Sequence, residues 1–138
     1  MRPFTDEGKD WFINLLKTNG FGDVRPAGNK FSAYDVIGDK KGELFAFELV
    51  SRDVTSTTYD SILLDEKKYI KLKKIPYHSI LVVFFIDKFY LINLKTRRPD
   101  SITTQLCKKT TKFANTDYVK KVVVKFDINK LKSVSYTK

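Results

Sequence analysis

Two carboxylates stand in otherwise apolar segments of the chain. Asp35 lies in FSAYDVIG (31–38) and Glu48 in ELFAFELVS (43–51), and both segments have the aromatic and β-branched residues typical of strands. A carboxylate in such a strand costs free energy unless an ionic group meets it. Carboxylates on neighbouring strands can share Mg²⁺ (or Mn²⁺), and a bound divalent ion lowers the pKa of an attacking water. The alternatives are an exposed strand face or two salt-bridged acids.

The elements that must position this pair are a hairpin and the helix before it. The turn Asp39-Lys40-Lys41-Gly42 joins the two strands and has glycine where a positive φ is needed. Before the hairpin, the sequence predicts a helix that Thr5 or Asp6 caps and that ends at Asn19-Gly20. Residues 21–29 form a loop or a short strand in this interpretation.

The rest of the chain predicts a second helix and further strands. Asp65 caps a helix over 66–74, after a polar loop at 52–61. The later elements are a buried strand over 78–86, a strand over 89–94, a short helix around 102–108, a strand over 119–126 and a final turn capped by Asp127. The fold class is therefore α/β (α+β), one domain over 1–138, with a mixed central sheet flanked by helices in the order α-β-β-α-β-β-(α)-β-α.

Composition narrows the class of protein. The chain has 138 residues, with 26 Lys+Arg against 16 Asp+Glu. The net charge is −2 over residues 1–60 and +12 over residues 61–138, which suggests a polyanion-facing surface in the second half. A single Cys107 and a single His78 exclude a disulfide framework and a Cys/His zinc site. The sequence lacks a long apolar run and a signal-peptide pattern, so we expect a cytoplasmic protein that is neither secreted nor membrane-bound.

The order of these elements resembles the PD-(D/E)XK nuclease superfamily, which includes Holliday-junction resolvases and restriction enzymes. The resemblance covers roughly residues 6–94: a helix, Asp35 in a strand, a short hairpin, Glu48 in a second strand, a helix and an apolar strand. It implies a restriction-endonuclease-like core and Mg²⁺-dependent cleavage of DNA. Asp35 and Glu48 would then be metal ligands, the backbone carbonyl of Leu49 would complete the metal shell, and Glu7 would be an additional acid near the metal.

Val50 departs from the superfamily pattern, which has a catalytic lysine two residues after the glutamate. That lysine orients or deprotonates the attacking water, and valine can do neither. Three explanations stay open. Lys67 or Lys68 on the following helix takes over the role, or a substitution at position 50 disables the enzyme, or the protein is a nuclease-like domain that only binds.

Basic residues after Glu48 fit a nucleic-acid partner. Arg52 follows the strand that carries Glu48 and is a candidate clamp for a phosphate. The remaining basic residues form groups on the second helix, after the fourth strand and near position 110: Lys67, Lys71 and Lys74; Lys95, Arg97 and Arg98; Lys108, Lys109 and Lys112. Each group alone is typical of a solvated face, but together they supply sequence-independent attraction to phosphates.

Three functions are consistent with these patterns. The first is a Mg²⁺-dependent DNA endonuclease, which needs a homodimer if it cuts two strands symmetrically. The second is an inactive nuclease-fold module that binds nucleic acid or a protein partner. The third is a basic RNA-binding domain in which Asp35 and Glu48 are incidental.

Overall fold

The computed structural model of the chain describes residues 6–26, 34–108 and 118–136. Its elements, in chain order, are α1 (Asp6–Thr18), β1 (Gly22–Pro26), β2 (Val36–Lys40), β3 (Glu43–Ser51), β4 (Ser61–Asp65), α2 (Glu66–Lys73), β5 (His78–Phe84), β6 (Lys88–Asn93), β7 (Ser101–Lys108), β8 (Tyr118–Asp127), the 3₁₀ turn η1 (Ile128–Lys130) and β9 (Ser133–Ser135). The predicted α/β class is confirmed.

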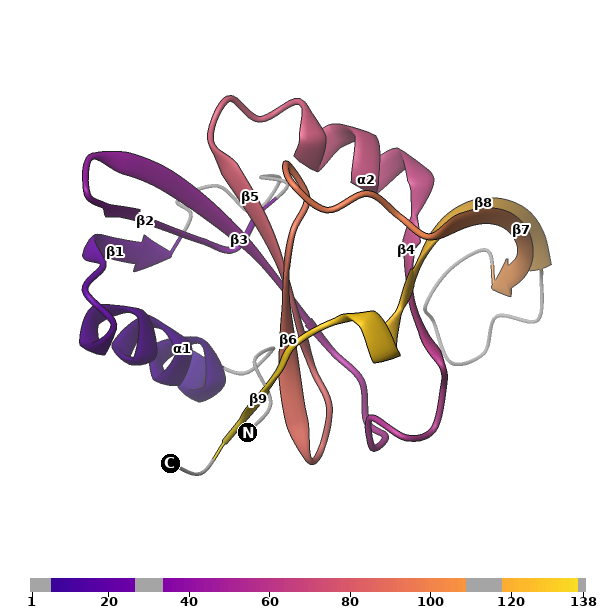
Figure 1. Cartoon of the computed structure of the whole chain (residues 1–138), viewed down its shortest axis with the longest axis horizontal. Coiled ribbons are helices and arrows are strands. Elements are labelled where there is room, and N and C mark those ends of the chain that lie inside the picture. Colours follow the sequence, from indigo (N-terminus) through magenta and orange to yellow (C-terminus); the bar gives the residue numbers. More distant parts are fainter. Residues whose placement is uncertain (1–5, 27–33, 109–117, 137–138) are drawn as a thin grey trace.

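The strands form two sheets. The larger has the order β1-β2-β3-β5-β6-β9, and the smaller has the order β4-β8-β7. In the larger sheet β3 and β5 run parallel and the other neighbours run antiparallel, so the predicted mixed central sheet is confirmed. Figure 1 shows α1 on one side of this sheet, and α2 with the smaller sheet on the other.

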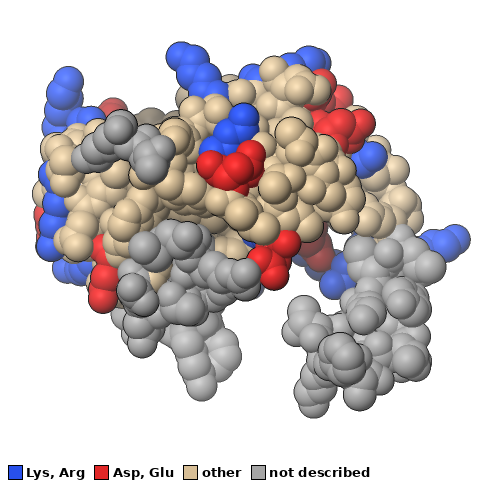
Figure 2. Space-filling model, turned by 90° about the horizontal axis from the view of Figure 1, so that it is seen from below, with Lys and Arg blue, Asp and Glu red and all other residues tan. Residues whose placement is uncertain are grey.

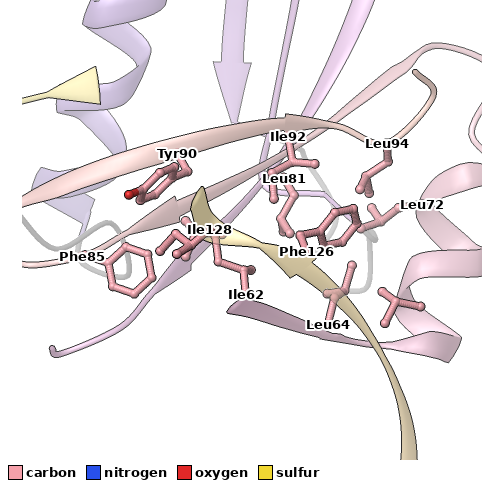
Figure 3. Close-up of a cluster of buried hydrophobic side chains, with 12 residues drawn as sticks. Ile62, Leu64, Leu72, Leu81, Phe85, Tyr90, Ile92, Leu94, Phe126 and Ile128 are labelled. Atoms are coloured by element: carbon pink, nitrogen blue, oxygen red, sulfur yellow. The ribbon is translucent and has the colours of Figure 1, made fainter. Parts of the chain in front are cut away.

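Each face of the larger sheet carries its own apolar core, because side chains alternate along the strands. On the α1 side, Phe12 and Leu16 of the helix pack against Phe47 of β3 and Phe84 of β5. On the other side, Leu81 and its neighbours pack against α2 and the smaller sheet. Figure 3 shows this second core, in which buried side chains from β4, α2, β5, β6 and β8 converge.

Several predicted elements are found where the sequence places them. The first helix, the hairpin at 39–42, the strand over 43–51 and the two central apolar strands are all present. Asp65 caps α2, and its side chain accepts a hydrogen bond from the N–H of Lys67. Asp127 caps the 3₁₀ turn in the same way, through the N–H of Asn129. Short polar side chains that bond to the backbone two residues later are thus reliable markers of both starts.

The predicted element order is wrong in the second half of the chain. The expected short helix around 102–108 is strand β7, which pairs with β8 along its whole length. The sequence does not predict strands β4 and β9, and of the loop or short strand that it predicts over 21–29 the structure has the short strand, β1. β4 pairs with β8, about sixty residues later in the chain, and β9 with β6. β4 and β9 thus depend on pairing with distant strands, whereas β7 pairs with β8, the next strand along the chain. Local propensity alone determines none of these three strands.

Candidate functional site

A two-residue turn sets the register that brings Asp35 and Glu48 together. Lys40 pairs with Glu43 across the β2–β3 hairpin, and the turn residues Lys41 and Gly42 have φ of 53° and 81°. Positive φ at both turn positions fits a type I′ turn, whose twist suits antiparallel strands. The ladder runs back to Val36, opposite Phe47. Asp35 therefore lies just before β2 and next to Glu48 of β3, and not inside a strand as the sequence predicts. A slip of one residue would place them on opposite faces of the sheet.

The Asp35 carboxylate is held by the backbone of β3. Its Oδ2 accepts a hydrogen bond of 2.8 Å from the N–H of Leu49, and its own N–H donates to the carbonyl oxygen of Phe47, also at 2.8 Å. Both bonds are made with residues on either side of Glu48. The position of Asp35 therefore depends on the backbone of the strand that carries the second acid.

Glu48 is a buried acid, with only 7% of its surface exposed. It lies on the α2 side of β3, opposite Leu81 of β5. Burial and a hydrogen bond with the Asp35 carboxyl raise the pKa of Glu48 to about 8, against the opposing effect of Lys68. The pair therefore holds less negative charge at neutral pH than two exposed acids would, because burial disfavours the ionised form of Glu48.

Lys68 of α2 reaches the carboxylate pair. Its Nζ lies 2.8 Å from Oε2 of Glu48, while the lysine side chain is still 44% exposed. Lys67, the other lysine proposed from the sequence, is exposed and donates its backbone N–H to the Asp65 cap. Of the two candidates, the helix therefore brings Lys68 to the acids.

Val50 lies two residues after Glu48 and on the same face of β3. Its side chain is half-buried and packs against the second core, beside Val83 of β5. Position 50, where the sequence resemblance would call for a lysine, thus carries an apolar side chain that packs between β3 and the smaller sheet.

The donor set suits a hard divalent cation. Two carboxylates lie side by side, and a bound cation would offset the burial that raises the pKa of Glu48. Among the residues that the structure describes, no group of three or more His, Cys, Asp or Glu side chains could hold a metal ion. Within the described part of the chain, further ligands would have to come from water, the Leu49 carbonyl or a substrate. The side chain of Glu7, predicted as an additional acid, lies outside the described part of the chain.

The predicted phosphate-binding residues are scattered. Arg52 is exposed just beyond β3, and Lys71 and Lys74 are exposed on and after α2. Arg98 is exposed as well, but Arg97 is half-buried and pairs with Asp100 at 3.1 Å. On the face seen in Figure 2, basic and acidic residues are interspersed.

Two lysines named from the sequence have other contacts or no described side chain. Lys95 donates from its ammonium group to the carbonyl oxygens of Lys73 and Ile75, and so closes the end of α2. The side chain of Lys108, and the whole of Lys109 and Lys112, lie outside the described residues. The predicted clusters therefore reduce, in the described structure, to the exposed lysines of α2 and to Arg52 and Arg98.

Sequence reasoning missed two residues that the fold brings to Arg52. A pocket of about 480 Å³ is lined by Arg52, by Lys125 of β8 and by Tyr59 of the loop between β3 and β4. Nothing in the sequence distinguishes Lys125 from the other lysines of its strand. The pairing of β4 with β8 brings it to the pocket that Arg52 lines. Tyr59 did carry a signal, because it is the one aromatic residue in a polar Thr/Ser-rich loop.

Comparison with known proteins adds a fold. Searches with protein-family models and against curated proteins give no match. Among solved structures, the chain is similar to Hjc, a Holliday junction resolvase from the archaeon Archaeoglobus fulgidus, with a TM-score of 0.52 and 11% sequence identity. The match covers 86% of this chain and 80% of the resolvase. At this identity the likeness establishes a resolvase-like fold and nothing finer. Within the described residues, the two α-helices are too short and too polar to cross a bilayer.

Proposed function

We propose that this protein is a metal-dependent endonuclease that hydrolyses phosphodiester bonds of DNA. The contact between Lys68 and Glu48 supports this function best. It supplies a lysine beside the two acids, although position 50 lacks one. The resolvase-like fold and the charge of +12 after residue 60 are consistent with a DNA partner.

In this proposal Asp35 and Glu48 hold Mg²⁺ or Mn²⁺, with the Leu49 carbonyl as a further ligand. When bound, the ion polarises the scissile phosphate and lowers the pKa of a water ligand. The Asp35 carboxylate is already fixed by the Leu49 N–H, so little reorganisation is needed to bind a cation. Binding would also keep Glu48 ionised, because a positive charge offsets the burial that now raises its pKa.

Lys68 orients the attacking water and offsets negative charge on the phosphate. It can do both because its ammonium group has three N–H donors and the contact with Glu48 occupies one of them. Its side chain is also partly exposed. Lys67 has no such contact with the acids and serves as the natural comparison. Arg52, four residues beyond Glu48 on the same face, would bind a neighbouring phosphate.

A cleavage assay tests the proposal. Wild-type protein should nick or linearise supercoiled plasmid in Mg²⁺ or Mn²⁺ and should not do so in EDTA. Glu48→Ala and Asp35→Ala should abolish cutting while circular dichroism shows the fold intact. If wild-type protein cuts no plasmid, duplex, nicked or branched DNA with either ion, the endonuclease proposal is wrong.

The second candidate is a nuclease-fold module that binds DNA without cutting it. Val50 favours this function, because its side chain is part of the core and leaves the usual lysine position apolar. Retained DNA binding together with no cleavage would support it. Preferential binding to RNA, with no effect of Asp35 or Glu48 substitutions, would instead support the RNA-binding function.

Cutting both strands of a duplex requires two such centres, and we propose a homodimer for that case. Sedimentation of the protein with and without DNA tests it. A monomer at concentrations where double-strand cuts accumulate would contradict the dimer.

A further inference from the structure

Two pockets meet at Tyr59, beyond the end of β3. One has a volume of about 480 Å³ and the other about 650 Å³, and both are lined by Tyr59 and Asp60. Each volume lies in the range of small-molecule binding sites. The Tyr59 side chain stands between them and is 62% exposed. We call the two pockets together the Tyr59 groove.

The loop that carries Tyr59 is anchored at several points. The Arg52 N–H donates to the Phe84 carbonyl at 2.8 Å, and the Ile128 N–H donates to the Asp60 carbonyl at 3.0 Å. In the middle, the Asp87 carboxylate accepts from both the N–H and the hydroxyl of Ser56, at 2.8 and 2.6 Å. An exposed aromatic ring on an anchored loop can bind a flat ligand with little ordering of the backbone, which lowers the entropic cost of binding.

Positive charge lines both sides of the groove. Arg52 and Lys125 contribute to the smaller pocket and Lys88 to the larger, whereas Asp60 is the single acid shared by the two. An aromatic face between cationic side chains suits a ligand that has both a flat ring and a phosphate. Proteins that bind single-stranded nucleic acid combine these two features.

The groove adjoins the carboxylate site along one strand face. Val83 lines the smaller pocket and is the β5 partner of Val50, which follows Glu48 by two residues. Arg52 follows Glu48 by four residues, which corresponds to about 13 Å of extended chain. A nucleotide in the groove would thus lie one or two nucleotides from a phosphate at Glu48.

We infer that the Tyr59 groove binds an unpaired nucleotide of the DNA substrate, with its base stacked on Tyr59 and its phosphate at Arg52 or Lys125. The inference rests on the proposed function for its choice of DNA. It narrows the substrate to DNA that has unpaired nucleotides next to a duplex, such as a tail, a flap or an opened branch point. A fully paired duplex could not place a base in the groove without breaking a pair.

Binding measured in EDTA tests the inference apart from cleavage. The probes are one fluorescent hairpin duplex and the same duplex with a single-stranded tail of six thymidines. Tyr59→Ala should weaken binding of the tailed duplex roughly 5- to 150-fold, the range that loss of one base–aromatic stack produces. It should change binding of the fully paired hairpin less than twofold, and Tyr59→Phe should bind both like wild type.

The matched control is Leu44→Ala, which removes a similarly exposed apolar side chain at the opposite end of β3. It should bind both probes like wild type. Equal affinity of Tyr59→Ala and wild type for the tailed duplex, or an equal loss on both probes, overturns the inference. So does failure of wild type to prefer the tailed duplex. The protein could also prefer the tailed duplex through Tyr59 and yet cut no DNA. That outcome would support nucleotide binding in the Tyr59 groove and contradict the proposed endonuclease activity.

Discussion

The ammonium nitrogen of Lys68 lies 2.8 Å from Oε2 of Glu48, although the two residues are on different elements and twenty positions apart in the chain. A helix side chain thereby reaches the acid that a strand lysine accompanies in the PD-(D/E)XK pattern. Val50 packs against the second core, and the lysine that contacts Glu48 comes from α2 instead. The geometry makes the role of each residue separable by substitution.

Lys68→Ala should lower the rate of plasmid cleavage by about 10²- to 10⁴-fold, the usual effect of losing a proton-transfer group. DNA affinity should change little, because one exposed charge among many contributes a small part of phosphate binding. Single-turnover cleavage at saturating protein measures the first quantity, and anisotropy in EDTA measures the second.

Lys67→Ala is the matched control for that prediction. It removes the same charge from the neighbouring position of α2 and leaves the backbone N–H that bonds to Asp65. Its cleavage rate should stay within a few-fold of wild type. Equal losses in the two variants would mean that the lysines act only through the general charge of the helix.

A lysine placed at position 50 should rescue the loss of Lys68. In Lys68→Ala/Val50→Lys, the new ammonium group starts from the same face of β3 as Glu48 and reaches the acids from the strand side. The double variant should cleave at least tenfold faster than Lys68→Ala.

A lysine at position 50 should also lower the stability of the fold. Val50 is half-buried against the second core, so Val50→Lys alone should lower the Tm, while its long side chain can extend toward solvent. Thermal unfolding of all three variants separates folding from rescue. A folded double variant with no gain in cleavage would show that a lysine beside Glu48 is insufficient, and would weaken the role proposed for Lys68.

The sequence singles out Asp35 and Glu48 as candidate site residues but does not choose between the lysines. Asp35 and Glu48 stand out because charge in an apolar strand demands an explanation, and the turn at 41–42 fixes their register locally. Which lysine of α2 meets Glu48 depends on the rotation of the helix over the sheet. That rotation is set by packing of Leu72 against strands that come later in the chain.

The errors in the second half have the same origin. Residues 101–108 have no strong local preference for helix or strand. They form a strand because β8 is available to pair with them. The Arg52–Lys125 pocket was equally hidden, because β8 must first pair with β4 to bring Lys125 near. The pairing of β4 with β8 joins strands about sixty residues apart, so no local pattern indicated it, whereas β7 was missed although its partner is the next strand along the chain.

The buried Glu48 should make stability depend on pH. Its pKa is about 8 in the folded protein against an ordinary value of 4.5. Between these values the unfolded chain has lost a proton that the folded chain retains, so this group stabilises the fold at low pH and less as pH rises from about 4.5 to 8. Above pH 8 both states are ionised and the loss is complete.

Glu48→Gln should remove this dependence, because the amide does not titrate. In thermal unfolding followed from pH 5 to pH 9, its Tm relative to wild type should rise up to about pH 8, by on the order of a few degrees at the upper end. Adding Mg²⁺ at pH 8 should raise the Tm of wild type and leave that of Glu48→Gln nearly unchanged. A constant difference between the two proteins across this pH range would mean that Glu48 is ionised in the fold throughout.

The Asp65 cap should affect cleavage through the position of Lys68. Asp65 ends β4 and starts α2, and its Oδ1 accepts a 2.9 Å hydrogen bond from the Lys67 N–H in the first turn of the helix. Asp65→Ala should lower the free energy of unfolding by about 1 kcal/mol, as loss of an N-cap usually does. Because fraying of that turn loosens Lys68, the rate constant for cleavage should fall, by less than in Lys68→Ala, while DNA affinity stays near wild type. Asp65→Asn keeps the cap and should restore both stability and cleavage. If it restores stability alone, the carboxylate of Asp65 itself contributes to the site, and the cap is not the route by which it acts.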